Sequence, residues 1–263
     1  MTTTSAPSGL LARLGGPTVA RRCAFCATAE ATHTITETGI SLARCAGCGY
    51  TFVDPAPTEA GLAGFDGSAP SDALARALGL PSLLERCEVE ARSAAQLFSL
   101  ISSSRTGGYL LDPGASTGTL SFLARRGGFS VEAFEPSPAR RELAAARGVV
   151  LSSEDIGAPR LPVGSFHVVA LHHYLERALD PLIALARVRR LLSPHGLVFL
   201  TTRRGAPLDE ALSPSDLAPF AALAEVTRCT AGNLASAFAA AQLRIVDLYS
   251  PDGHELVAIG EPA

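Results

Sequence analysis

The residues best placed for chemistry follow a short hydrophobic run, 109–111, that stops at a carboxylate and enters a turn of small side chains. The turn spans residues 112–118, and its candidate ligand-binding residues are Asp112, Gly114, Ser116 and Gly118. About twenty residues further on, a second hydrophobic run, 130–134, ends at Glu135. An acidic residue at this spacing takes the hydroxyls of a ribose in dinucleotide-type folds. The pattern predicts a nucleoside-containing ligand bound across the carboxyl ends of two parallel strands.

The same residues exclude several common cofactors. A nicotinamide dinucleotide fingerprint needs a glycine at the middle position of the turn, where this chain has Ser116. The sequence contains no lysine, so it has neither a Walker phosphate loop nor the Schiff-base lysine of pyridoxal enzymes. A ligand with a ribose and no phosphate remains.

Four cysteines near the N-terminus form two pairs with metal-ligand spacing. The pairs are C-x2-C motifs separated by eighteen residues, and their members are Cys23, Cys26, Cys45 and Cys48. This spacing is typical of a structural zinc site, in which four thiolates surround the ion. Because a segment this small has no core of its own, we expect zinc to hold it together, with iron as the rival metal and a pair of disulfides as the less favoured alternative. Cys87 and Cys229 lie far from these motifs in apolar context and are interpreted as buried thiols.

The segment 112–118, followed by Glu135, resembles motif I of class I S-adenosylmethionine-dependent methyltransferases. Residues 166–201 are similar to the signature of the same family. Together with the cysteine module and the C-terminal third, the resemblance runs from about residue 20 to the end of the chain. It implies an α/β fold with a Rossmann-like seven-stranded sheet, mostly parallel, that ends in a C-terminal antiparallel hairpin. It also implies S-adenosylmethionine as the cofactor, with Glu135 at the ribose and Asp155 at the adenine amino group.

Four residues depart from the family pattern, namely Ser116, His167, Arg177 and His195. Arg177 stands where the family usually has histidine, which removes one possible acid or base from that position. A loss of catalysis therefore stays open beside the enzymatic interpretation.

The resemblance and the cysteine spacing together predict four parts of the chain. We expect a disordered tail over 1–20, a zinc ribbon over 21–54, a linker and helical cap over 55–105, and the methyltransferase domain over 106–263. The ribbon ends in the sequence VDPAPT, as in a group of bacterial methyltransferases associated with sugar, polysaccharide and natural-product pathways. Residues 57–84 and 203–227 are expected to form the walls of the acceptor pocket.

Methyl transfer to a hydroxyl benefits from a base beside the cofactor, because phenols and sugar hydroxyls hold their protons tightly. His172 and His173 follow the strand expected over 166–171, at the edge of the sheet where the cofactor binds. Since side chains alternate along a strand, one imidazole should face the pocket and the other should point away. We predict His173 as the catalytic base, with His172 second. The alternative is that both histidines only shape the pocket wall.

Charge and composition limit the partners of the chain. The net charge of −3 gives no general attraction to nucleic acid or to an anionic membrane. No run of residues has the length of a transmembrane helix or of a signal-peptide core, and we expect a cytoplasmic protein. The leading prediction is O-methylation of a small molecule such as a sugar or a natural product, with carbon or nitrogen acceptors and the oligomeric state left open. An rRNA guanine methyltransferase and a catalytically inactive cofactor-binding scaffold are the alternatives.

Overall fold

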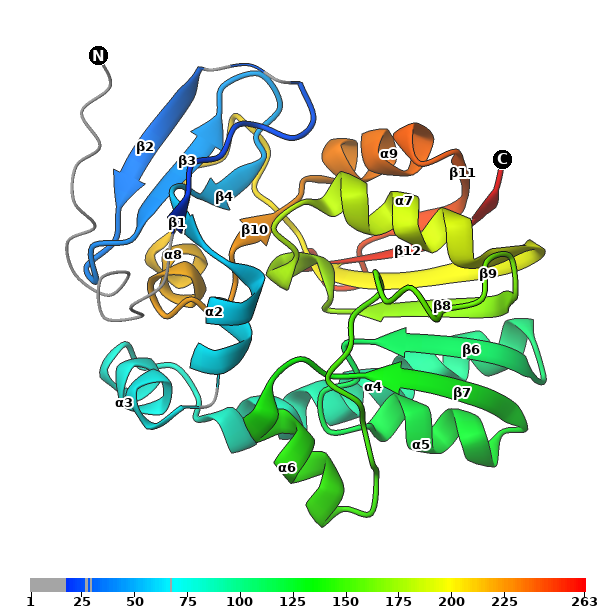
Figure 1. Ribbon diagram of the computed structural model, residues 1–263. Helices are drawn as coiled ribbons and strands as arrows, with labels where there is room; N and C mark the ends of the chain where they lie inside the picture. The colour runs from blue at the N-terminus through cyan, green and yellow to red at the C-terminus, as the bar shows by residue number, and fades with distance from the viewer. Residues whose placement is uncertain (1–17, 27, 29, 67) are drawn as a thin grey trace.

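A mixed β-sheet lies at the centre of the computed structural model, which describes residues 18–26, 28, 30–66 and 68–263 (Figure 1). In spatial order its described strands are β11 (Leu243–Tyr249), β12 (Glu255–Pro262), β9 (Leu192–Arg203), β8 (Phe166–His172), β6 (Gly108–Pro113) and β7 (Phe129–Phe134). Strands β9, β8, β6 and β7 are parallel, whereas β12 is antiparallel to both of its neighbours. The expected α/β fold with a C-terminal antiparallel hairpin is confirmed.

The seventh strand of the expected sheet is reduced to a single bridge. Phe134, the last residue of β7, pairs in parallel with Ser152, and the backbone N–H of Glu135 donates to the carbonyl of Ser152 at 2.9 Å. The segment that contains Ser152 therefore lies at the edge of the sheet, beside β7. It contributes one pair of residues there, so six of the seven expected strands are regular in the described chain.

The central strands of the sheet are apolar on both faces, as expected for buried parallel strands. Neighbouring residues of one strand enter different hydrophobic clusters: Val168 packs with Ile101 and Leu120, whereas Val169 packs with Leu185 and Phe238. The helices that supply the first cluster are α4 (Leu83–Ser104) and α5 (Thr119–Arg126). Those that supply the second are α7 (Pro181–Leu191) and α9 (Ala231–Ala240). The sheet is thus covered on both faces.

The N-terminal cysteine module forms a small antiparallel sheet that is completed from far along the chain. Its strands in spatial order are β10 (Thr227–Arg228), β4 (Thr51–Val53), β3 (Ser41–Cys45) and β2 (Ala31–Ile35). β2 and β3 form a hairpin, and β4 pairs with β10 through Thr227 with Phe52 and Arg228 with Thr51, a contact that the sequence did not predict. The sheet therefore joins the ribbon to the segment 203–227.

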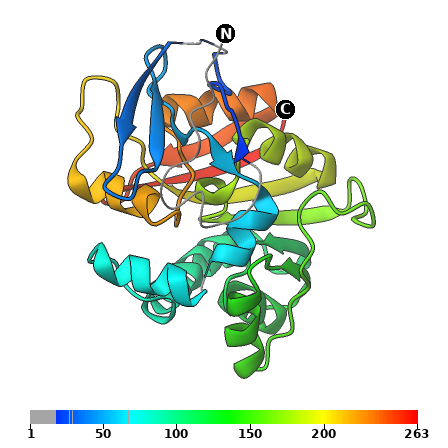
Figure 2. The same ribbon diagram turned by 60° about the vertical axis from the view of Figure 1, so that its left-hand side comes forward.

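A buried cluster connects the same two segments. Ile40, Leu42 and Val53 of the ribbon pack with Phe220, Leu223 and Val226, which lie in and after α8 (Pro214–Ala221). Figure 2 shows the ribbon strands beside α8. The ribbon thus has a core, but this core is shared with the C-terminal half of the chain. Both this sheet and this core cross the predicted domain boundary at residue 54.

The N-terminal segment contributes one short strand, and the described part of the cap contributes three helices. β1 (Thr18–Val19) pairs with β5 (Ala56–Pro57), so the last residues of the expected disordered tail are paired, while residues 1–17 lie outside the described chain. The cap contains α2 (Glu59–Phe65), α3 (Ala69–Ala77) and α4. Two further elements frame the site, α6 (Pro138–Ala146) and the 3-10 turn η1 (Leu175–Arg177). None of the helices described is both long and apolar enough to cross a membrane.

The shared cluster predicts that a cavity opened in it lowers the stability of the protein. Phe220 is fully buried, so Phe220→Ala should lower the free energy of unfolding by about 3–5 kcal/mol. Urea unfolding followed by circular dichroism measures the change. Phe122→Ala, at a side chain 48% exposed on α5, is the matched control and should change stability little. An equal effect of the two substitutions would contradict the shared core.

Candidate active site and metal centre

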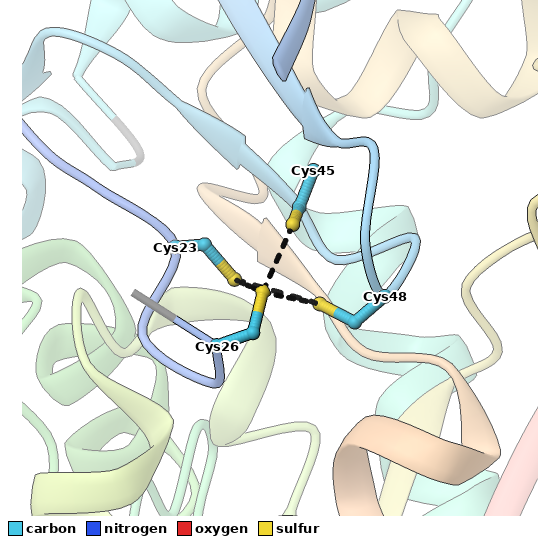
Figure 3. A group of neighbouring side chains, drawn as sticks. All are labelled: Cys23, Cys26, Cys45 and Cys48. Atoms are coloured by element: carbon cyan, nitrogen blue, oxygen red, sulfur yellow. Dashed lines mark hydrogen bonds between the residues drawn. The ribbon is translucent and has the colours of Figure 1, made fainter. Parts of the chain in front are cut away.

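The four cysteine sulfurs converge on one point (Figure 3). All four Sγ atoms lie within 4.8 Å of one another, and the separations of Cys26 from Cys45, Cys23 and Cys48 are 3.3, 3.5 and 3.8 Å. Cys23 and Cys48 are 3.4 Å apart. These distances are far longer than the bond of about 2.05 Å in a disulfide, so the four side chains are free thiols.

The donor set fits zinc. A zinc ion with four thiolates at about 2.3 Å in tetrahedral geometry separates the sulfurs by about 3.8 Å, close to the separations found here. Gly47 lies beside this centre, since a Cβ added to it would stand 3.5 Å from the sulfur of Cys26 and 3.8 Å from that of Cys45. The arrangement has no open position for a substrate, which is typical of a structural site.

The small-residue turn after β6 depends on two backbone conformations. Gly118 has φ +75°, and a Cβ there would lie 2.4 Å from Cγ1 of Val149, so this position requires glycine. Ser116 also has a positive φ, +52°, which is strained for a residue with a side chain. Its backbone N–H donates to Oε2 of Glu135 at 2.9 Å, and its hydroxyl donates to Glu90 at 2.6 Å. These contacts hold the turn closed although the family glycine is missing.

Glu135 lies at the carboxyl end of β7 and is 4% exposed. Besides the N–H of Ser116, it accepts the backbone N–H of Ser137 on its other oxygen at 2.8 Å. Burial raises the pKa of Glu135 above its usual value, and the nearby guanidinium groups of Arg140 and Arg177 oppose this shift. Each oxygen keeps a second acceptor site, so the carboxylate is oriented and can still receive ligand hydroxyls.

Asp112 has a different position from the other predicted cofactor residues. It is 1% exposed and accepts the hydroxyl of Ser121, in α5, at 2.6 Å. Burial raises the pKa of Asp112 to about 7. The carboxyl group thus joins the end of β6 to the first turn of α5 and does not line the cavity described below. Its direct contact with a cofactor stays a prediction.

One cavity of about 750 Å³ opens at the carboxyl ends of the parallel strands. The predicted site residues that line it are Gly114, Ser116, Glu135, Asp155, His172 and His173. Asp112 and Gly118, the first and last residues of the turn, do not line the cavity. The volume lies in the range of small-molecule sites.

The cap closes this cavity, whereas the segment 203–227 does not. Residues 59–64 of α2 lie in the wall, as expected for 57–84. Among the described residues, no part of the wall comes from 203–227, which we also expected there. That segment instead packs against the ribbon, because its apolar side chains fill the shared cluster.

Both histidines line the cavity, although strand alternation predicted that only one would. His173 has φ +48°, so the chain leaves the extended conformation after His172 and the alternation ends there. Nδ1 of His173 lies 2.8 Å from Glu176, and Nε2 lies 2.9 Å from Glu255. Although burial favours neutral imidazole, these two carboxylates raise the pKa of His173 to about 10. A protonated ring with both nitrogens engaged argues against its predicted role as a base.

His172 has the opposite electrostatic character. Its Nε2 lies 2.8 Å from the hydroxyl of Ser93 in α4. Burial, together with the charge of His173, lowers the pKa of His172 to about 3. The ring is therefore neutral at physiological pH and can accept a hydrogen bond, but it holds a transferred proton weakly.

A buried ion network beneath the cofactor turn was missed by the sequence analysis. Arg140 of α6 pairs with Asp66 at 2.6 Å and with Glu90, and it donates to the hydroxyl of Ser116 at 2.8 Å. Although burial opposes ionisation, Arg140 lowers the pKa of Glu90 to about 2. Arg177 reaches the same Asp66 at 3.3 Å. The serine in place of glycine was the available signal, since its hydroxyl requires partners.

Comparison with known proteins agrees with this geometry. Residues 85–248 match the family described as a methyltransferase domain, so the chain belongs to the S-adenosylmethionine-dependent methyltransferases. It is 33% identical over 116 residues to a ubiquinone biosynthesis O-methyltransferase of Xanthomonas oryzae pv. oryzae. The match covers 41% of this chain and 48% of that protein, so the chain spans about half the length of the curated relatives that it matches.

Solved structures show the same fold at low identity. Geranyl diphosphate C-methyltransferase of Streptomyces coelicolor A3(2), in complex with Mg²⁺, geranyl diphosphate and S-adenosyl-L-homocysteine, is similar with a TM-score of 0.57 and 13% identity, over 67% of this chain and 80% of that one. The cyclase SpnF is similar with a TM-score of 0.52 and 17% identity, over 64% of this chain and 80% of that one.

The cysteine geometry predicts metal-dependent stability. The purified protein should contain about one equivalent of zinc, and Cys45→Ser should release it and lower the melting temperature, because Cys45 is fully buried in a cluster with Tyr50 and Cys229. Elemental analysis and thermal unfolding measure both effects. Cys87→Ser, at a buried thiol far from the centre, is the control and should keep the metal. A metal-free wild-type protein would contradict the prediction.

The ion pairs of His173 predict a pH-dependent contribution to stability. Its folded pKa of about 10 exceeds the ordinary value of 6.5, so the contribution is complete below pH 6.5 and is lost as the pH rises through 10. His173→Gln should therefore destabilise the protein more at pH 6 than at pH 10 in urea unfolding. His254→Gln, at an exposed side chain, is the control. A difference that is independent of pH would contradict the assignment of charge.

Proposed function

We propose that the protein transfers a methyl group from S-adenosylmethionine to a hydroxyl oxygen of a small molecule. The observation that carries the proposal is the position of Glu135. Two backbone N–H groups orient its carboxylate at the wall of the cavity, which Gly114 and Asp155 also line. Glu135 would hold the ribose hydroxyls, Gly114 would allow close approach of the cofactor, and Asp155 would contact the adenine. When bound, the cofactor supplies the methyl group and the leaving group.

The protein contributes mainly proximity and orientation. The cavity has room for the cofactor and a second small molecule, and α2 separates it from solvent on one side. His172 lines the cavity as a neutral ring, and we propose it as the partner of the acceptor hydroxyl. His173, paired with Glu176 and Glu255, would hold the end of β8 against the start of β12.

The similarity to the Xanthomonas O-methyltransferase supports oxygen as the methylated atom. That relative is matched over about half of its length, so its substrate is not carried over to this chain. The fold itself does not choose the reaction, because the cyclase SpnF and a geranyl diphosphate C-methyltransferase share it.

The rRNA alternative is weakened because two of the three ribbon arginines, Arg21 and Arg44, bind within the protein. Arg44 donates to the carbonyls of Ala206 at 3.1 Å and Glu210 at 2.9 Å. Arg21 donates to the carbonyl of Val226 at 3.3 Å and also to that of Leu179. Both side chains bind the ribbon to the rest of the protein, so they are not displayed as a phosphate-binding surface.

Calorimetric titration tests the proposal and separates it from an inactive fold. S-adenosylmethionine and S-adenosylhomocysteine should bind, and NAD should not. Glu135→Gln should weaken binding roughly tenfold to a hundredfold, as expected when a charge-assisted hydrogen bond is lost. Glu142→Gln, at an exposed residue of α6, is the control. Unchanged affinity in Glu135→Gln would mean that the ribose lies elsewhere.

An acceptor screen with hydroxylated compounds then distinguishes an enzyme from a scaffold. Formation of S-adenosylhomocysteine that depends on the acceptor supports the proposed reaction. Tight cofactor binding without turnover across all acceptor classes would contradict catalysis and favour the scaffold.

A further inference from the structure

The small-residue turn after β6 is held by two side chains from other elements. The hydroxyl of Ser116 donates to Oε2 of Glu90 at 2.6 Å and accepts from Nη1 of Arg140 at 2.8 Å, and Glu90 and Arg140 also pair with each other. Glu90 comes from α4 of the cap and Arg140 from α6. The three side chains therefore form a closed triangle that joins the cap to the turn.

The triangle is enclosed and carries charge. Ser116 and Arg140 are buried, and the side chain of Glu90 is 24% exposed. Although burial opposes ionisation, Arg140 holds the pKa of Glu90 at about 2, so the carboxylate is charged at physiological pH. Arg140 is itself anchored by Asp66 at 2.6 Å. Because hydrogen bonds to ionised groups are the stronger ones, the hydroxyl of Ser116 has two firm partners.

The same serine orients the predicted ribose ligand. Its backbone N–H donates to Oε2 of Glu135 at 2.9 Å, while its φ is +52°. A residue with a side chain keeps such a φ only where its surroundings compensate the strain. The hydroxyl contacts of Ser116 supply this compensation, so the orientation of Glu135 depends on them.

We propose that Glu90 is a positioning residue for the cofactor. From the cap it fixes the hydroxyl of Ser116, and it thereby keeps the turn in the conformation that orients Glu135. The inference rests on the proposed function, in which Glu135 holds the ribose hydroxyls. Glu90 also lines the cavity, so a direct contact between its carboxylate and the ligand is the competing role that an experiment must separate.

Substitutions at residue 116 test the backbone part of the inference. The probe is S-adenosylhomocysteine, titrated by calorimetry into the full chain. Ser116→Ala should weaken its binding roughly tenfold, because alanine keeps the strain and loses both contacts. Ser116→Gly should bind more tightly than Ser116→Ala, because glycine adopts a positive φ without this strain. Loss of buried volume alone would give the reverse order of the two variants.

Substitutions at residue 90, made in two backgrounds, separate positioning from direct contact. Glu90→Ala should weaken binding roughly threefold to tenfold when residue 116 is serine, as for a lost hydrogen bond. It should have little effect in the Ser116→Gly background, where no hydroxyl remains to be held. Glu90→Gln keeps an oxygen that can accept the hydroxyl and should retain most of the affinity. Glu88→Ala, at an exposed residue of α4, is the matched control and should bind as wild type.

Hydrogen exchange of the Ser116 amide adds a measurement without ligand. Glu90→Ala should speed this exchange, because the N–H is released from Glu135 when the turn loosens.

Equal weakening by Glu90→Ala in both backgrounds would assign Glu90 a direct contact and overturn the inference. Wild-type affinity in Ser116→Ala would overturn it as well, even if Glu90→Ala does not fold, and the proposed function would stand. A wild-type protein that binds neither S-adenosylmethionine nor S-adenosylhomocysteine would contradict the proposed function, and the inference with it.

Discussion

The pairing of β4 with β10 is the constraint on which the rest of the structure depends. It joins Phe52 to Thr227 and thereby fixes the segment that follows α8 against the ribbon. From there, Val226 donates to the carbonyl of Glu176 at 2.7 Å, and the hydroxyl of Thr227 donates to that of Leu175 at 2.8 Å. The 3-10 turn that carries Arg177 is therefore held from the ribbon side, and so is one wall of the cavity.

Local patterns in the sequence were sufficient for the parts of the site that one strand or turn creates. Gly118 and Glu135 follow from the strand–turn–helix pattern, and the four cysteines follow from their spacing, because each depends on neighbours close in the chain. The pairing of β10 and the contact of Arg140 with Asp66 join residues far apart in the sequence. No periodicity or motif reports such tertiary contacts, and for this reason 203–227 was expected at the acceptor pocket although it packs against the ribbon.

His173 shows how one backbone angle can change a functional interpretation. Alternation along β8 is valid up to His172, and it fails at the next residue because φ becomes +48°. The imidazole then lies between two carboxylates that no pattern near residue 173 foretells, since Glu255 belongs to the C-terminal hairpin. The residue type suggested a base, whereas its surroundings make it a cation.

The ribbon has a structural consequence beyond its own four thiols. Arg21, two residues before Cys23, donates to carbonyls of Val53, Val226 and Leu179, and Leu179 lines the cavity. A metal that fixes the first cysteine pair therefore also fixes the neighbouring segment around Arg21, whose side chain supports this wall. Since Arg21 and Arg44 are both used inward, they fix the ribbon against backbone carbonyls of the rest of the protein, and through Leu179 this contact reaches the wall of the cavity.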